Sequence, residues 1–386
     1  MKILFSLTYY TPYVSGLTLY VKRLTGALAR KPFVPQGEPF VPQDKGHQIS
    51  VICFQHEKTL RTHEAIAGVK VYRAKPLLKI SKGFLSFDWI LLSWRLVRQH
   101  DAIVVNLPQF EGIVLALWAK IFGKKLISLY HCEVVLPPSW SNKLIELILK
   151  LSHLVTLCLS DVVITYTEDF AKHSPGLSPF RGKIKYIYPP ISKPKVNKRV
   201  QKIIRDKIGD KHAYTIGIAA RLAAEKGIEY VLEAIPRIDG KVKVVIAGSL
   251  NPVGEEEYKR KILHLVQKYK NYVVFLGELK EEDMGSFYSL LDVLVLPSVN
   301  STEAFGMVQV EAMMMGVPVV ATDLPGVRVP IQESGMGILV PSGNSQKLGE
   351  AIVEILKNKK KYIKKKKVIE KEFAFEKTVK FYENQL

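Results

Sequence analysis

Two glutamates on either side of a glycine-containing turn are the residues of this sequence that are best placed to do chemistry. Glu303 and Glu311 are eight residues apart in the segment Pro297–Gly326, which reads PSVNSTEAFGMVQVEAMMMGVPVVATDLPG. If a helix begins near Phe305 or Gly306, Glu303 lies in the loop at its positive end and Glu311 lies about one and a half turns inside it. A carboxylate would then stand beside the free amides of a helix start.

The backbone N–H groups at this turn are the second part of the expected site. They would point into the same space as Glu303 and offer donors to an anionic ligand. The residues that we expect to line the turn are Ala304, Phe305, Gly306, Met307 and Val308. Taken alone, the segment also fits an acidic helix start followed by a buried helix and a strand.

Two cations follow a predicted strand earlier in the chain. Ile216–Arg221 (IGIAAR) reads as a buried strand, and an amphipathic helix follows Lys226. Arg221 and Lys226 therefore lie between the carboxyl end of a strand and the start of the next helix, where open α/β sheets bind ligands. Two fixed cations there would stabilise the negative charge that a leaving diphosphate gains. Solvated surface charges are the alternative.

These segments, in this order, resemble the retaining glycosyltransferases of family 4. Glu303 and Glu311 match the E-x7-E motif of that family, and Arg221 and Lys226 match its arginine and lysine five residues apart. The resemblance implies an α/β protein with two Rossmann-like domains facing across a cleft, the GT-B architecture, and a C-terminal helix that crosses back to the first domain. It also implies that Arg221 and Lys226 clamp the donor diphosphate, that Glu303 holds sugar hydroxyls and that Glu311 binds the ribose.

Two further segments extend the resemblance to the nucleotide. Val242–Gly248 (VKVVIAG) is an apolar strand that ends in a glycine, and Ser249 follows it. Family members have a similar glycine turn near the nucleotide, and the backbone after their next strand reads the base edge. The corresponding residue here is Leu279, just after Gly277. Because backbone contacts do not name the base, UDP-, GDP- and ADP-sugars are all candidate donors.

The first turn of the amino-terminal half is another expected donor contact. Lys2–Leu7 reads as an apolar strand, and the chain then turns through Ser15 and Gly16 into a helix. This turn resembles the loop that closes over the donor phosphates in the family. Serine replaces the first of the two glycines usual there, and it restricts a backbone that glycine leaves free.

His131 is the expected catalytic residue of the amino-terminal half. Lys125–Tyr130 (KLISLY) reads as a strand whose end delivers this histidine. In the family a histidine at this position lies against the donor sugar and helps to hold the developing oxocarbenium ion, so the resemblance gives His131 that role. A hydrogen-bonded structural histidine is the alternative. We interpret Cys132 as a packing residue, because adjacent side chains on a strand point to opposite faces.

Length and patterning predict the domain organisation. Apolar strands alternate with amphipathic helices in both halves of the 386 residues, which favours two parallel-sheet units. We expect an acceptor-side domain over 1–190, a nucleotide-sugar domain over 191–370 and a returning helix over 371–386. The insertion Pro32–Asp44 repeats PFVPQ, and its prolines predict an exposed loop because they disfavour helices and sheet ladders.

Composition narrows the partners and cofactors. The formal net charge of +20 could attract nucleic acid, anionic lipid or an anionic substrate, but no segment resembles a nucleic-acid module, so we expect no nucleic acid partner. The three cysteines lack CxxC spacing and fit a reducing cytoplasm. No aspartate occurs two positions after another, so the D-x-D metal motif is missing and we expect a metal-independent reaction without a cofactor.

Two segments of the first half place apolar and basic side chains next to each other. They are Gly83–His100 and Ser139–Ser160. Neither has the ~20 predominantly apolar residues of a membrane-spanning helix. Peripheral attachment to the inner membrane surface and packing into the first core both fit this pattern.

The resemblance and these observations together predict a cytoplasmic retaining glycosyltransferase. It would move a hexosyl unit from a nucleoside-diphosphate sugar to a hydroxyl of a glycan or lipid-linked acceptor. Two alternatives stay open: a nucleotide-sugar epimerase of the same architecture, which would need no acceptor, and a non-catalytic protein that binds sugar or membrane.

Overall fold

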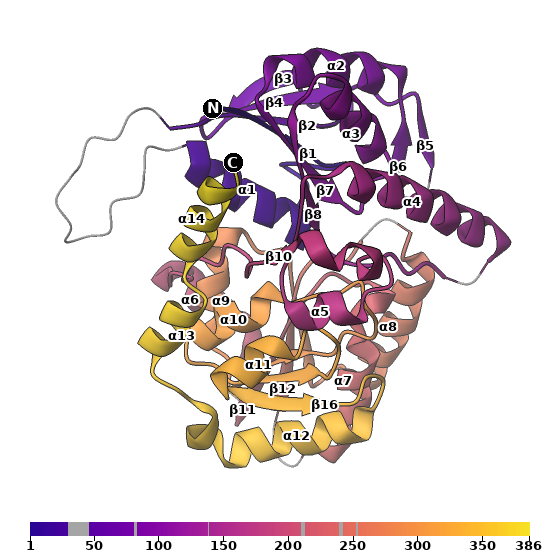
Figure 1. The fold of residues 1–386 in the computed structure, drawn as a ribbon. Helices are drawn as coiled ribbons and strands as arrows, with labels where there is room; N and C mark the ends of the chain where they lie inside the picture. Colours follow the sequence, from indigo (N-terminus) through magenta and orange to yellow (C-terminus); the bar gives the residue numbers. More distant parts are fainter. Residues whose placement is uncertain (30–45, 81–82, 138, 210–212, 239–241, 252–253) are drawn as a thin grey trace. The chain divides into compact units, whose positions relative to one another are not determined.

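The computed structural model describes residues 1–29, 46–80, 83–137, 139–209, 213–238, 242–251 and 254–386. These residues form two compact units, one made of Met1–Pro190 with Phe375–Leu386 and the other of Ile191–Ala374. Figure 1 labels the helices and strands of both units. The predicted loop Pro32–Asp44 lies outside the described residues.

The first unit is built on an eight-stranded sheet in the order β10-β9-β8-β7-β1-β2-β4-β3. Its strands pair in parallel, except that β3 is antiparallel to β4. The strands are β1 (Lys2–Ser6), β2 (Gln48–Phe54), β3 (His63–Ile66), β4 (Val69–Ala74), β7 (Ala102–Leu107), β8 (Lys125–Tyr130), β9 (Val162–Thr165) and β10 (Ile184–Tyr186). The central strands are nearly continuous runs of buried apolar residues, as expected for a parallel sheet covered on both faces.

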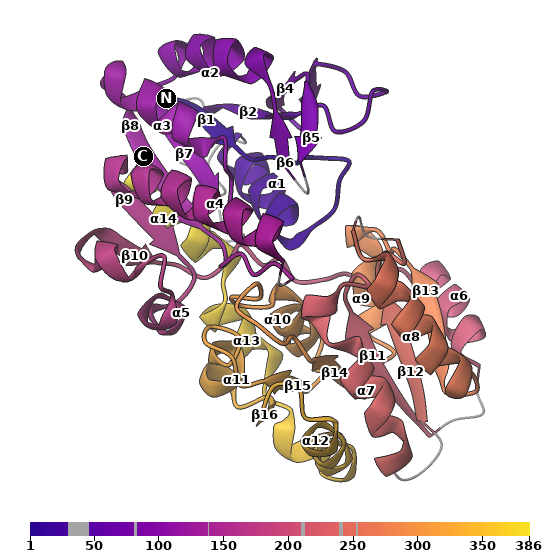
Figure 2. The same ribbon diagram turned by 90° about the vertical axis from the view of Figure 1, so that its right-hand side faces the viewer.

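Helices cover both faces of this sheet. They are α1 (Gly16–Ala29), α2 (Phe87–Gln99), α3 (Gly112–Ile121), α4 (Trp140–Leu159), α5 (Glu168–His173), the 3₁₀ helix η1 (Ser178–Lys183) and α14 (Phe375–Gln385). Helix α1 connects β1 to β2, whereas α3 connects β7 to β8 in the opposite direction along the sheet. Because both connections are right-handed crossovers, the two helices lie on opposite faces of the sheet. Figure 2 shows α2, α3 and α4 side by side, and α2 and α4 each contact α3.

Local sequence sets where these helices begin. The side chains of Ser86, Ser139 and Thr167 each accept a hydrogen bond from the N–H group three residues later and so cap α2, α4 and α5. A short antiparallel hairpin, β5 (Leu78–Ile80) and β6 (Gly83–Leu85), precedes α2. The predicted segment Gly83–His100 is therefore a strand, β6, followed by a helix, α2. Ser86 separates the two, because its backbone is extended and it caps the helix that begins at Phe87.

The last helix of the chain, α14, packs in the first unit, as predicted. The hydroxyl groups of Tyr382 and Tyr20 are hydrogen-bonded at 2.8 Å, and both rings are fully buried. Thr378 donates to the carbonyl oxygen of Tyr188 at 2.9 Å, and the Lys185 ammonium donates to Gln385 at 2.6 Å. Figure 1 shows α14 beside α1, so the two ends of the chain complete one core.

The second unit is built on a six-stranded parallel sheet in the order β13-β12-β11-β14-β15-β16. The strands are β11 (Tyr214–Ala219), β12 (Val242–Ala247), β13 (Val273–Gly277), β14 (Val293–Leu296), β15 (Val319–Thr322) and β16 (Gly337–Val340). The α-helices are α6 (Lys198–Ile208), α7 (Ile228–Ala234), α8 (Glu256–Lys268), α9 (Met284–Tyr288), α10 (Met307–Met314), α11 (Val329–Ser334), α12 (Ser345–Lys357) and α13 (Lys366–Glu372). Short 3₁₀ turns are η2 (Ala224–Lys226), η3 (Ile235–Arg237), η4 (Glu281–Asp283) and η5 (Lys359–Tyr362).

Each of the two large sheets has a point between two adjacent parallel strands at which the winding direction reverses. In the second unit the chain winds outward through β11, β12 and β13 on one side and through β14, β15 and β16 on the other. In the first unit the same reversal lies between β1 and β7. The loops at the carboxyl ends of the two strands diverge at such a point and leave room for a ligand. The predicted fold class, α/β with two Rossmann-like units, is confirmed.

Replacing Tyr382 with alanine should destabilise the first unit. Removing a fully buried ring leaves a cavity and an unpaired Tyr20 hydroxyl, so we expect a loss of roughly 3–5 kcal/mol in the free energy of unfolding. Urea unfolding followed by tryptophan fluorescence measures this unit alone, because all four tryptophans, at positions 89, 94, 118 and 140, belong to it. Phe381→Ala, at the half-buried neighbouring position, should cost clearly less; an equal cost would contradict the assignment.

Candidate functional site

The expected donor-binding residues of the second unit all follow the carboxyl ends of its strands. Arg221 and Lys226 follow β11, Gly248 and Ser249 follow β12, and Leu279 follows β13. Glu303 and the turn before α10 follow β14. The cations and Glu303 thus stand on the two sides of the reversal between β11 and β14, where a ligand site is expected.

Arg221 lies in the loop two residues beyond β11 and is paired with Glu225. The strand ends at Ala219, earlier than the sequence pattern predicted. The Arg221 guanidinium donates to Glu225 Oε1 at 2.6 Å, and the two side chains are 30% and 12% exposed. Burial works against the charged form of Glu225, but the positive charges of Arg221 and Lys226 outweigh it and hold the pKa of this carboxyl below its ordinary value. Both partners are therefore ionised at neutral pH.

Lys226 and Glu303, which are distant in sequence, meet in the second unit. The Lys226 ammonium donates to Glu303 Oε2 at 2.6 Å, and the side chains are 20% and 16% exposed. The Ser298 hydroxyl lies 3.4 Å from the same carboxylate oxygen. The two loops are joined by a backbone hydrogen bond, in which Val299 N–H donates to the Glu225 carbonyl at 3.0 Å. This bond fixes the distance at which Lys226 approaches Glu303.

Gly248 allows the loops after β11 and β12 to touch. A Cβ atom at this position would lie 2.0 Å from the carbonyl oxygen of Ala220, which no side chain tolerates. The N–H of Leu222 donates to the carbonyl of Ser249 at 2.9 Å, so this contact continues past the glycine. Gly248 and Ser249 therefore shape the Arg221 loop. Leu279 is half-buried and follows β13, the edge strand of the sheet.

The predicted turn before α10 has the expected conformation. Gly306 caps the helix with φ at 75°, a left-handed conformation that favours glycine, and α10 starts at Met307. Ala304 and Phe305 are buried, whereas Met307 and Val308 are half-buried in the first turn. Backbone donors of a helix start thus lie a few residues from Glu303.

Glu311 occupies the inner part of α10. It is 5% exposed, and the Tyr288 hydroxyl donates to its Oε2 at 2.7 Å. A buried polar group of this kind needs a hydrogen-bond partner. Tyr288 is one such partner; the contact of Glu311 with a ribose remains a prediction.

Ser15 and Gly16 form the start of α1 in the first unit. Ser15 N–H donates to Thr18 Oγ1 at 2.7 Å, and Thr18 N–H donates to Ser15 Oγ at 3.2 Å. This reciprocal pair satisfies two backbone donors of the helix start. Serine in place of glycine is therefore a helix cap in this chain, which gives a structural reason for the departure from the family pattern.

His131 is a buried residue whose ring is held by protein groups. It is 4% exposed; Nε2 lies 2.9 Å from Asn106 Oδ1, and Nδ1 is hydrogen-bonded to the Tyr166 hydroxyl. Asn106 Nδ2 donates to the Ser6 carbonyl, so its Oδ1 accepts from His131 Nε2–H and Nδ1 accepts from Tyr166. Burial lowers the pKa of His131 to about 3, and the ring is neutral at physiological pH. The ring positions its neighbours; a direct contact with a sugar remains a prediction.

Several site residues were missed from the sequence. In the second unit they are Glu225, Tyr288 and Ser298, which hold Arg221, Glu311 and Glu303 respectively. Ser298 carried the clearest signal, since it is the first polar residue after the apolar run of β14. The other two are polar residues on short helices, and only their contacts distinguish them from surface residues.

A further polar and aromatic cluster lies at the carboxyl edge of the first sheet. Glu111 accepts hydrogen bonds from Phe84 N–H at 3.3 Å and from the Thr8 hydroxyl at 3.4 Å, and burial raises its pKa to about 7. The Tyr9 ring packs against those of Tyr13 and His56, with centroids 4.7 and 5.5 Å apart. These residues follow β1, β2 and β7, so they flank the reversal point of this sheet.

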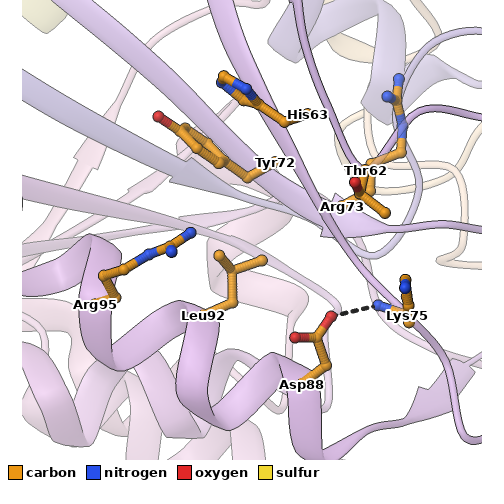
Figure 3. A pocket seen from close by; sticks show the side chains of 8 residues that line it. All are labelled: Thr62, His63, Tyr72, Arg73, Lys75, Asp88, Leu92 and Arg95. Carbon is orange, nitrogen blue, oxygen red and sulfur yellow. Dashed lines mark hydrogen bonds between the residues drawn. The ribbon is translucent and has the colours of Figure 1, made fainter.

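A hollow of 370 Å³ in the first unit contains none of the expected site residues (Figure 3). It is lined by Thr62, His63, Tyr72, Arg73, Lys75, Asp88, Leu92 and Arg95. Arg73 is bound internally, to Glu64 at 2.5 Å and to two backbone carbonyls at 2.8 Å. Asp88 accepts from the backbone N–H of Lys75 at 2.8 Å, the contact drawn in Figure 3. These contacts tie β3, β4 and α2 together.

Comparison with protein families gives two matches that follow each other along the chain. The model described as "Glycosyltransferase Family 4" matches residues 43–193, and the one described as "Glycosyl transferases group 1" matches residues 200–372. An uncharacterized glycosyltransferase of Methanocaldococcus jannaschii is 27% identical over 328 residues, which are 79% of this chain and 89% of that protein. Phosphatidyl-myo-inositol mannosyltransferase of Mycobacterium leprae is 33% identical over 136 residues, 34% of each chain.

Solved structures show the same fold. HepE of Anabaena, in complex with UDP and glucose, has a TM-score of 0.76 with this chain at 19% identity, and the match covers 100% of both chains. A sucrose-phosphate synthase from Thermosynechococcus elongatus has a TM-score of 0.77 at 18% identity, covering 100% of this chain and 98% of the other. At these identities the likeness concerns the fold alone.

The buried, neutral state of His131 should make the first unit less stable in acid. Its pKa is about 3 in the folded chain and ordinarily about 6.5, so the unfolded chain binds a proton between these values that the folded chain does not. The associated stability is complete above pH 6.5 and is lost as the pH falls towards 3, by up to about 1.4 kcal/mol per pH unit. Urea unfolding by tryptophan fluorescence at pH 7 and about pH 5 measures this loss.

His131→Gln should reduce the pH dependence without removing it. His153 is also buried, which lowers its pKa to about 4, and it contributes in the same direction. His173→Gln changes an exposed histidine and serves as the matched control. The assignment is wrong if His131→Gln and His173→Gln alter the slope of stability against pH equally.

Proposed function

Because the chain belongs to the group 1 and family 4 glycosyltransferases, we propose that it is a retaining, metal-independent hexosyltransferase. It takes a hexosyl unit from a nucleoside-diphosphate sugar and transfers it to a hydroxyl group of a glycan or lipid-linked acceptor. The donor binds at the carboxyl edge of the second unit, and the acceptor is assigned to the first unit. We place the reaction in the cytoplasm.

The observation that carries this proposal is that two ion pairs, Arg221 with Glu225 and Lys226 with Glu303, lie at the reversal point of the second sheet. Cations beside carboxylates match the needs of a sugar diphosphate, which presents negative phosphate oxygens beside hydroxyl donors. As the bond between the anomeric carbon and the phosphate oxygen breaks, the diphosphate gains charge. Fixed cations stabilise that charge most in the transition state.

The remaining roles follow from chemistry and position. Glu303 accepts hydrogen bonds from sugar hydroxyls, and the backbone donors from Ala304 to Val308 contribute beside it. Glu311 binds the ribose, and Gly248, Ser249 and Leu279 border the nucleotide. In the first unit, Ser15 and Gly16 are assigned to phosphate binding and His131 to the sugar.

The known relatives support the chemical class of both substrates. HepE has been solved with UDP, with UDP and glucose, and with UDP-glucose, which favours a UDP-sugar as the first donor to test. The name of the Mycobacterium leprae relative describes a mannosyltransferase that acts on a phospholipid, which supports a lipid-linked acceptor. Arg221 and Lys226 take the part of the divalent ion that other glycosyltransferases use.

Replacing Lys226 with alanine should lower kcat/KM for transfer by roughly 10²–10³-fold, the usual effect of removing one preorganised charge donor. The fold should remain, because Lys226 does not belong to the hydrophobic core of the second unit, and thermal unfolding checks this. Lys261→Ala is the matched control, since Lys261 of α8 is another lysine that is paired with a glutamate, namely Glu229 of α7 at 2.9 Å. The proposal fails if both variants retain the same rate.

The reaction class can be separated from donor isomerisation in the same assay. Incubation with labelled donor alone should leave the sugar unchanged, whereas addition of an acceptor should consume it. If the donor sugar were epimerised in the absence of an acceptor, the protein would be an epimerase and the transferase proposal would be wrong.

A nucleoside-diphosphate sugar that binds the folded chain should raise its melting temperature. At a ligand concentration of about 100 times Kd, mass action stabilises the bound form by about 2.7 kcal/mol. We expect a rise with UDP-, GDP- or ADP-sugar in the wild type and a smaller rise in Arg221→Ala. No shift with any of the three at saturating concentration would refute the proposed donor class.

A further inference from the structure

Helix α4 of the first unit has an inverted distribution of polar and apolar residues. Its buried face carries Ser152, His153, Thr156 and Leu157. Its exposed face carries large apolar side chains that are 36–82% exposed: Trp140, Leu144, Leu147, Ile148, Leu151, Leu154 and Val155. A helix on the surface of a water-soluble protein normally shows the opposite pattern. The spacing of three and four residues places these apolar side chains on one stripe along the helix.

Hydrogen bonds on the inner side of α4 account for the polar half of this pattern. The Ser152 hydroxyl donates to the Phe110 carbonyl at 2.6 Å, and Thr156 donates to the Ser152 carbonyl at 2.8 Å. Ser160, just beyond the helix, is hydrogen-bonded to Ser128 of β8 at 2.6 Å. The bonds of Ser152 and Ser160 therefore anchor α4 to the unit with its apolar stripe outward, whereas the bond of Thr156 lies within the helix.

The neighbouring helices extend the exposed apolar surface. On α2 the residues are Phe87, Ile90, Leu91 and Trp94, and on α3 they are Leu117 and Ile121. Helices α2 and α3 lie beside each other, and α3 also contacts α4 (Figure 2). The hairpin before α2 adds Leu77, Leu78, Ile80 and Leu85. We call these residues, with the stripe of α4, the apolar face. It holds most of the exposed large apolar side chains of the described chain.

Cations accompany the apolar face. The Arg98 guanidinium lies over the rings of Trp94 and Phe122, 4.9 and 5.7 Å from their centroids, and so joins α2 to the end of α3. Lys143 and Lys150 flank the stripe of α4, and Arg95 follows Trp94. Such side chains lay their carbon stems along apolar surface and keep the charge in water.

The acidic groups on the same elements are held by nearby donors. Asp88 accepts from Lys75 N–H at 2.8 Å, Glu146 accepts from Leu136 N–H at 3.0 Å, and Asp161 pairs with Lys120 at 2.5 Å. The exposed cations Arg95, Arg98, Lys143 and Lys150 therefore lie around the apolar face. The chain as a whole carries a formal net charge of +20. An anionic apolar partner complements this combination.

We propose that the apolar face docks the first unit onto an anionic lipid bilayer. The helices lie in the interface plane with their apolar stripes among the acyl chains and their cations at the lipid phosphates. In the described residues no helix is long and apolar enough to cross a bilayer. The exposed Trp94 and Trp140 suit the boundary between headgroups and acyl chains.

A second copy of this chain fits the face less well than a bilayer does. A two-fold symmetric contact places the same patch on both partners, so the contact would contain Arg95, Arg98, Lys143 and Lys150 twice. Like charges brought together in this way oppose association. Anionic headgroups remove this repulsion and add attraction.

The test is co-sedimentation of the full chain with vesicles of phosphatidylcholine alone and of phosphatidylcholine with phosphatidylglycerol. We expect binding to the anionic vesicles, weaker binding to the neutral ones, and a loss of binding when NaCl is raised to roughly 0.5 M, which screens the charges. A blue shift of tryptophan fluorescence should accompany binding. Absence of binding to both vesicle types would overturn the proposal.

Leu147→Glu combined with Leu151→Glu should weaken vesicle binding by about tenfold or more, because two side chains that are each 54% exposed no longer enter the bilayer. Ile203→Glu combined with Leu263→Glu is the matched control; it adds the same charge at exposed apolar positions of the second unit. An equal loss in both double variants would show a net-charge effect and overturn the proposal. So would a dimer in analytical ultracentrifugation that the first double variant abolishes, because a second copy would then occupy the face.

Discussion

The parallel pairing of β11 with β14 is the constraint on which the candidate site depends. It aligns Ile216 with Val293 and Gly217 with Leu294, although these strands are separated in sequence by β12 and β13. The loops that leave the two strands turn to opposite sides of the sheet, and the space between them is bordered by backbone donors and charged side chains. A substitution that weakened this pairing would move Lys226 away from Glu303, even though neither residue belongs to a strand.

Charge balance explains how the site keeps two cations in place before a ligand arrives. Arg221 and Lys226 are each paired with a carboxylate at 2.6 Å, and all four side chains are no more than 30% exposed. A partly buried cation without a partner would lose solvation without compensation. The carboxylates therefore hold the cations in defined positions, and preorganisation of this kind is what makes fixed charges effective in a transition state.

The first unit shows an asymmetry between the two faces of its sheet. One face is covered by α1 and by α14, whose Tyr382 closes the core from the far end of the chain. The other carries α2, α3 and α4, which all present large apolar side chains outward, and α4 in addition buries mainly polar residues. The hydrogen-bonded interior around His131, Asn106 and Tyr166 fixes the edge of the sheet between these layers. The proposed docking surface and the polar sheet edge thus belong to the same unit.

The sequence by itself determined the fold class, several strands of both sheets and the charged residues of the candidate site, because apolar runs and glycine turns are local properties. Ile216–Arg221, for example, was recognised as a strand, but both of its ends were placed two residues too late, since β11 is Tyr214–Ala219. The tertiary structure decided the partners: Glu225 for Arg221, Tyr288 for Glu311 and the Asn106–Tyr166 pair for His131. It also decided which side of α4 faces outward. These outcomes depend on which strands become neighbours, and hydrogen bonds between loops 77 residues apart, such as that of Lys226 with Glu303, leave no periodic trace in the sequence.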